Sequence, residues 1–152
     1  MENIDKKEAL KRLKSIEEET IQLRKIIEKK DDWASIVDFE SASIFLGEDS
    51  GDVDKWKYAG LTLSQINGLC LERCIKAVNT TNGKLWIPDF SNTNQRKWYN
   101  WFEKKSSGWL LYVVVYGFGF AVCGFGFYYE TEEKARHGAK YFKQYYNIWL
   151  GN

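Results

Sequence analysis

The chain has little of the chemistry on which most enzymes and metal sites depend. Its 152 residues include a single histidine, His137, and three cysteines. Cys70 and Cys74 are one helical turn apart, but a structural zinc site takes four ligands, so we expect both thiols in the core and His137 at the surface. The sequence has neither a serine–histidine–aspartate set nor a phosphate-binding glycine loop followed by lysine and threonine. We therefore expect no enzymatic activity, no cofactor and no metal.

The cysteine content indicates the cellular compartment of the protein, and the small net charge excludes one class of partner binding. An odd number of cysteines and a charged amino-terminal segment without a signal peptide favour a reducing cytoplasm, which we expect to be that of a host cell. The formal net charge of +1 excludes a uniformly basic nucleic-acid coat. A chain of this length can bury one core without disulfides.

Charge is unevenly distributed along the chain. Residues 33–58 hold six acidic and two basic residues, whereas residues 59–107 hold three acidic and seven basic ones. Such a dipolar field can orient a protein on a partner, and the acidic segment could mimic nucleic acid. Residues 48–54 lack the alternating ligands and terminal glutamate of a calcium loop, so we expect a solvated loop there.

Residues 5–30 contain neither glycine nor proline and are rich in Glu, Lys, Leu and Ile, which predicts a helix. Apolar positions spaced alternately by four and three form a heptad seam of somewhat under three repeats: Ala9, Leu13, Ile16, Thr20, Leu23 and Ile27. Either a second subunit, in a coiled-coil homodimer through residues 5–30, or another helix of the same chain must cover this seam.

Three further helices are predicted by their caps. Asp38 can cap a short helix that ends before Gly47. Thr62, with glutamine three residues later, forms a capping box for a second helix, which ends near residue 79. Thr131, followed by two glutamates, begins the last helix, which we expect to run without interruption to about residue 150.

Residues 108–129 carry no charged side chain over twenty-two positions, the length of a membrane-spanning helix. Five glycines, a run of three valines and eight Phe or Tyr residues favour strands instead. We expect two antiparallel strands that turn near residues 117–119, or one long strand kinked at its glycines. A shorter strand is predicted at residues 84–87, where Pro88 ends it.

Residues 86–102, WIPDFSNTNQRKWYNWF, combine six aromatic residues with an Arg–Lys pair, which is typical of a binding surface. Residues 89–94 are types that form ordered turns, and Trp86 and Phe90 are expected to anchor this loop. The predicted partner-binding residues are Arg96, Lys97, Trp98, Tyr99, Trp101, Lys104 and Lys105. They could form a stacking platform for single-stranded nucleic acid, a protein-binding surface or a structural clamp.

The run PDFSNTNQRKWYNWF, followed by glycine-rich strands, resembles a family of small proteins encoded by phages, prophages and mobile elements of Bacteroidota. The resemblance covers about residues 36–150, and the helix before Lys30 lies outside it. It implies a non-enzymatic accessory protein, and the best-fitting class is an anti-CRISPR inhibitor of host defence that binds an RNA-guided nuclease effector or its guide RNA. No catalytic residue follows from the resemblance.

The sequence is also compatible with two other functions. The chain could be a single-stranded nucleic-acid-binding module of phage replication or packaging, or a virion or assembly component. For the fold, the pattern predicts an α+β protein in which an amphipathic helical arm, residues 1–32, precedes a compact domain, residues 33–152. In that domain helices pack on a small antiparallel sheet and the chain ends in a helix. No membrane partner is expected.

Overall fold

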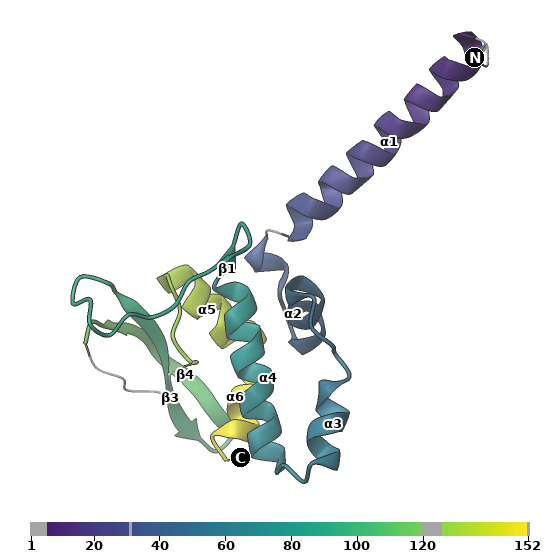
Figure 1. The fold of residues 1–152 in the computed structure, drawn as a ribbon. Coiled ribbons are helices and arrows are strands. Elements are labelled where there is room, and N and C mark those ends of the chain that lie inside the picture. The colour runs from purple at the N-terminus through teal and green to yellow at the C-terminus, as the bar shows by residue number, and fades with distance from the viewer. Residues whose placement is uncertain (1–5, 31, 120–125, 152) are drawn as a thin grey trace. The chain divides into compact units, whose positions relative to one another are not determined.

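The computed structural model describes residues 6–30, 32–119 and 126–151. Its helices and two antiparallel strand pairs confirm the predicted α+β class, with helices against a small sheet and a helix at the C-terminal end (Figure 1). The chain divides into two units, residues 1–32 and residues 33–152. The first unit contains helix α1, Lys6–Lys30, and the second contains all the other elements.

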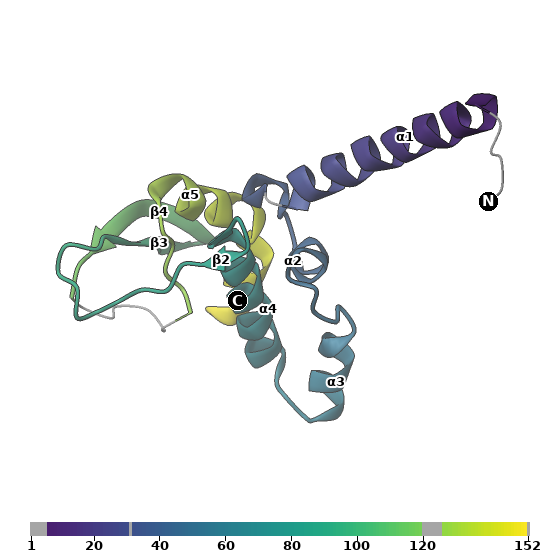
Figure 2. The ribbon, with the colours of Figure 1, turned by 45° about the horizontal axis from the view of Figure 1, so that its top comes forward.

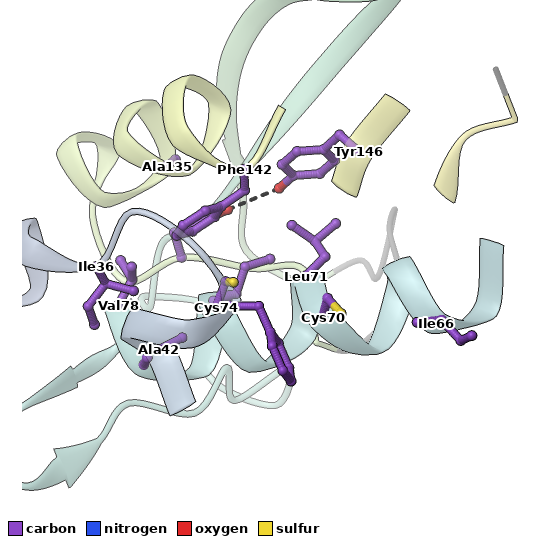
Figure 3. Close-up of a cluster of buried hydrophobic side chains, with 14 of the residues drawn as sticks. Ile36, Ala42, Ile66, Cys70, Leu71, Cys74, Val78, Ala135, Phe142 and Tyr146 are labelled. Carbon is purple, nitrogen blue, oxygen red and sulfur yellow. Dashed lines mark hydrogen bonds between the residues drawn. The ribbon is translucent and has the colours of Figure 1, made fainter. Parts of the chain in front are cut away.

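Helix α4, Leu63–Val78, is the centre of the second unit. Helices α2, Phe39–Leu46, and α6, Lys143–Trp149, both pack against it. Figure 3 shows Leu71, Cys74 and Val78 of α4 within the cluster that they form with residues of α2 and α5. The buried core includes Ile36, Ala42, Ile66, Cys70, Leu71, Cys74, Ile75, Val78, Phe142 and Tyr146. The expectation that both cysteines lie in the core is confirmed.

The predicted caps are present in the structure. The Asp38 carboxylate accepts a hydrogen bond from the Ser41 amide at 2.8 Å, and α2 ends at Gly47, whose φ is +68°. Thr62 begins α4 with the predicted capping box. The Thr131 hydroxyl accepts from the Lys134 amide and begins α5, Glu132–Tyr141. These helix starts depend on side chains within one turn, which is why sequence alone locates them.

The prediction of a solvated loop at residues 48–54 is wrong, because helix α3, Asp52–Tyr58, begins within it. The Arg73 guanidinium on α4 pairs with Glu48 at 2.7 Å and with Asp52 at 2.6 Å, and it lies 4.7 Å from the Phe39 ring centre. The hydrogen bond from Arg73 holds the pKa of Asp52 below its ordinary value. Acidic residues that looked free in the sequence are therefore bound to a partly buried arginine.

The larger sheet is a hairpin of β3, Lys97–Lys105, and β4, Gly108–Gly117, with a bulge between Trp101 and Phe102. The Trp98 amide also donates to the Tyr129 carbonyl oxygen at 3.0 Å, and the Tyr129 amide donates to the Trp98 carbonyl oxygen at 2.7 Å. In Figure 2, α5 lies across the hairpin. A two-residue ladder joins β1, Thr80–Thr81, to β2, Lys84–Leu85.

The strand expected in the first half of residues 108–129 is present as β4, but its partner differs from the prediction. It pairs with β3, part of the stretch that was expected to form the aromatic loop. The expected second strand falls partly on residues 120–125, which lie outside the described residues. In the described part of the chain, no helix is both long enough and apolar enough to cross a membrane.

The prediction of one uninterrupted last helix is wrong, because the chain breaks at Phe142, where φ is −99° and ψ is 13°. The break directs α5 onto the β3–β4 hairpin and α6 onto α4. His137 on α5 is also not a free surface residue. Its Nε2 lies 2.6 Å from the Ile36 carbonyl oxygen, and its ring is 4.5 Å from that of Tyr141.

The two core cysteines should resist thiol reagents. Burial raises the pKa of the Cys70 thiol to about 11 and raises the pKa of the Cys74 thiol as well, so neither is a thiolate near neutral pH. In a Cys123→Ser variant, we expect the two remaining thiols to react with Ellman's reagent at least about a hundredfold more slowly in the native protein than in urea. Equal rates in the two conditions would contradict the buried placement.

Candidate functional site

The loop that precedes β3 is held by its own polar side chains, as predicted. The Asp89 carboxylate accepts hydrogen bonds from the Ser91 hydroxyl at 2.6 Å and from the Ser91 amide at 2.9 Å, which hold the pKa of Asp89 below its ordinary value. The Gln95 side chain accepts from the Asp89 amide at 2.6 Å and donates to the Ile87 carbonyl oxygen at 3.3 Å. The loop backbone is therefore fixed before any partner is present.

Lys97 is fully buried beneath this loop. Its ammonium donates to the carbonyl oxygens of Asn92 at 2.9 Å, Gln95 at 2.8 Å and Phe118 at 2.6 Å. A lysine ammonium has three protons, so these contacts use its full capacity. The prediction that Lys97 contacts a partner is therefore corrected: the side chain joins the loop to the chain that follows β4.

Tyr99 is also unavailable to a partner, because only 9% of its surface is exposed. Its ring lies 5.7 Å from the ring of Tyr128, on which Phe90 also packs at 5.3 Å. The expectation that Phe90 anchors the loop is confirmed. Tyr99 belongs to the same structural cluster and is removed from the predicted contact set.

One aromatic surface that remains exposed lies at the start of β3 and the end of β4. The Arg96 guanidinium is stacked 4.8 Å from the centre of the Tyr116 ring, which in turn packs 4.8 Å from Trp98 and 5.4 Å from Phe118. Tyr116 is 42% exposed and Phe118 is 40% exposed. We call Arg96, Trp98, Tyr116 and Phe118 the Arg96 cluster.

The structure separates the other predicted residues from this cluster. Lys104 and Lys105 lie at the opposite end of β3, about 25 Å from its start at the usual rise of a strand. Lys105 pairs with Glu103 at 2.6 Å, and the Lys104 ammonium lies 5.2 Å from the Trp109 ring centre. Trp101 is 54% exposed, but strand alternation places it on the sheet face opposite to Trp98.

Two members of the Arg96 cluster, Tyr116 and Phe118, were not predicted as site residues. They became neighbours of Arg96 through the register of the hairpin, in which Trp98 is opposite Tyr116. The glycines and the Phe or Tyr residues of the uncharged stretch, residues 108–129, were the only signal in the sequence. It did not reveal the strand partner, because pairing between distant segments leaves no local pattern.

A separate groove lies between α4 and the segment after β2. It has a volume of about 240 Å³ and is walled by Ile75, Leu85, Ile87, Pro88 and Tyr128, with Glu72 and Lys76 also lining it.

Two acidic side chains outside the groove have partners of their own. Asp89 accepts a hydrogen bond from Ser91 within the loop, and Glu103 forms an ion pair with Lys105. Among the described residues, no group of three or more His, Cys, Asp or Glu side chains is placed to hold a metal ion.

Comparisons with known proteins do not assign a function to this site. No family model, no curated protein and no solved structure matches this chain.

Proposed function

We propose that this chain is a non-enzymatic binding protein that docks onto a partner protein through the Arg96 cluster. The observation that supports this most is the stack of Arg96 on the half-exposed Tyr116, beside the exposed Phe118. Arginine and aromatic side chains are the residue types that contribute most to protein interfaces. Because Lys97 fixes the neighbouring loop, little conformational entropy is lost when a partner binds.

A protein partner fits this surface better than single-stranded nucleic acid does. A nucleic-acid platform needs cations along the backbone path beside the stacking rings. Of the four predicted cations, Lys97 is buried, and Lys104 and Lys105 are at the far end of the hairpin. Arg96 is the only one of the four beside the rings. The counterion release that drives nucleic-acid binding would therefore be small.

Within the class of protein partners, we propose an RNA-guided nuclease effector of host defence, so that the chain acts as an anti-CRISPR inhibitor in the host cytoplasm. The resemblance of residues 88–102 to phage-encoded proteins supports this choice. Mimicry of nucleic acid by the acidic segment is a weaker mechanism, because Glu48 and Asp52 pair with Arg73 and Asp54 pairs with Lys57. The aromatic surface is the better candidate for contact.

The test is binding of the purified chain to guide-loaded nuclease effectors, measured by biolayer interferometry. We expect Arg96→Ala combined with Phe118→Ala to weaken binding about a hundredfold, because each removes an exposed side chain from the centre of the contact. Tyr58→Ala is the matched control, since Tyr58 is 94% exposed on α3 and should leave affinity unchanged. Near-ultraviolet circular dichroism checks that the variants are folded.

The same measurement on single-stranded RNA and DNA distinguishes the alternative. Tight oligonucleotide binding that weakens steeply as salt rises would replace the protein partner with nucleic acid. Unchanged effector binding in the Arg96 and Phe118 double variant would remove the cluster from the interface. Failure of every effector to bind would overturn the nuclease proposal.

A further inference from the structure

The described side chains of α1, residues 8–22, are all exposed, including large apolar ones. Leu13 is 54% exposed and Ile16 is 59% exposed. Helices of this kind gain most of their stability in proteins by packing an apolar face, and propensity alone leaves them marginal. The charged residues beside the seam determine which partner helix can pack against it.

The heptad seam defines a position for each residue of α1. Leu13, Thr20 and, by sequence, Ile27 are at position a, while Ala9, Ile16 and, by sequence, Leu23 are at position d. The residues at positions e and g flank the seam and face a partner helix. They are Leu10, Arg12, Glu17, Glu19, Arg24 and Ile26.

The charges at e and g favour a second copy of the same helix in parallel, in-register alignment. In that arrangement each g residue faces the e residue five positions later on the partner helix. Arg12 then faces Glu17 of the second copy, and Glu19 faces Arg24, so both pairs are attractive. An antiparallel pair would bring e to e and g to g, which places Glu17 beside Glu17 and Glu19 beside Glu19.

Thr20, the polar residue in the seam, does not oppose this packing. Its hydroxyl donates to the Ile16 carbonyl oxygen at 2.7 Å, one turn back along the helix. Because the hydroxyl is already paired, it does not need a partner across the interface. The cost of burying an unpaired polar group is therefore avoided at this position.

We propose that α1 forms a parallel, in-register two-stranded coiled coil with a second copy of this chain. The proposal is independent of the partner of the Arg96 cluster. Since Lys30 is the C-terminal end of α1, both 33–152 units follow the same end of the coil. The dimer would thus present two copies of the Arg96 cluster and bind a partner that has two matching sites with increased avidity.

Sedimentation equilibrium of the full chain tests the proposal. We expect a monomer–dimer equilibrium, which Ile16→Lys converts to monomer. Arg12→Glu should raise the dimer dissociation constant about tenfold, since it makes two symmetric pairs repulsive. Arg12→Glu with Glu17→Arg should restore dimerisation. Lys11→Glu, at position f, makes the same change in net charge away from the seam and should have little effect.

The double variant separates the interchain pair from effects within one helix. Arg12 also pairs with Glu8 of its own helix at 3.0 Å, and this contact is lost in the single and the double variant alike. Recovery in the double variant therefore reports the pair between chains. A monomer up to millimolar concentration would overturn the dimer, and a dimer that Arg12→Glu does not weaken or that the double variant does not restore would overturn the parallel arrangement.

Discussion

Replacing Lys97 by methionine is expected to lower the free energy of unfolding by about 3–4 kcal/mol, the loss typical of a broken buried charged contact. Methionine fills much of the lysine volume but cannot donate to the carbonyl oxygens of Asn92, Gln95 and Phe118. These oxygens would lose charge-assisted hydrogen bonds, and those covered by the loop would stay without a donor. Urea denaturation followed by circular dichroism measures the change.

Lys84→Met is the matched control, because Lys84 is exposed on β2 and its replacement should change stability by less than about 0.5 kcal/mol. The same pair of variants distinguishes a structural Lys97 from a partner-binding one. If Lys97→Met left stability unchanged but abolished partner binding, the prediction that Lys97 contacts a partner would be right and its structural role would be wrong.

Replacing Gly138 by alanine is expected to lower the free energy of unfolding by about 2–3 kcal/mol. In an exposed helix the same change would stabilise by about 1 kcal/mol through helix propensity. Here a Cβ would overlap the Tyr129 hydroxyl oxygen and would lie 2.5 Å from Tyr129 Cζ. The ring cannot move aside easily, because Tyr129 is fully buried and its hydroxyl is 3.0 Å from that of Tyr146. Overpacking should therefore outweigh propensity.

A double-mutant cycle checks this cause. Tyr129→Leu removes the ring that the new methyl group would meet, so the double variant should be clearly less destabilised than the sum of the two single variants. Additive losses would mean that Gly138 matters for another reason. Thermal denaturation of the wild type, the two single variants and the double variant measures these losses.

Both predictions concern residues that hold the backbone around the Arg96 cluster in place. Lys97 holds the loop and the segment after β4 together, and Tyr129 extends the sheet beside Trp98 while its side chain packs against α5. An interface whose side chains are held by such contacts loses less entropy on binding than a flexible one. We therefore expect Lys97→Met to weaken partner binding as well, in proportion to the loss of loop structure.

Local features of this protein were predictable from sequence because they depend on residues within one turn of each other. Asp38, Thr62 and Thr131 cap their helices, and α1 follows from a run without glycine or proline. The ordered turns near Asp89 and the burial of Cys70 and Cys74 were also anticipated. In each case the responsible side chains and backbone groups are neighbours along the chain or along one helix face.

Contacts between distant segments were decided only by the tertiary structure. The sequence did not reveal that β4 pairs with residues 97–105, that the last helix breaks at Phe142, or that Arg73 binds the acids before and within α3. The predicted partner-binding residues, between positions 96 and 105, were expected to share one surface, but strand alternation and loop closure separated them. Lys97 and Tyr99 were buried, whereas Arg96 was left at the surface beside Tyr116, because a side chain's exposure depends on which segments fold over it.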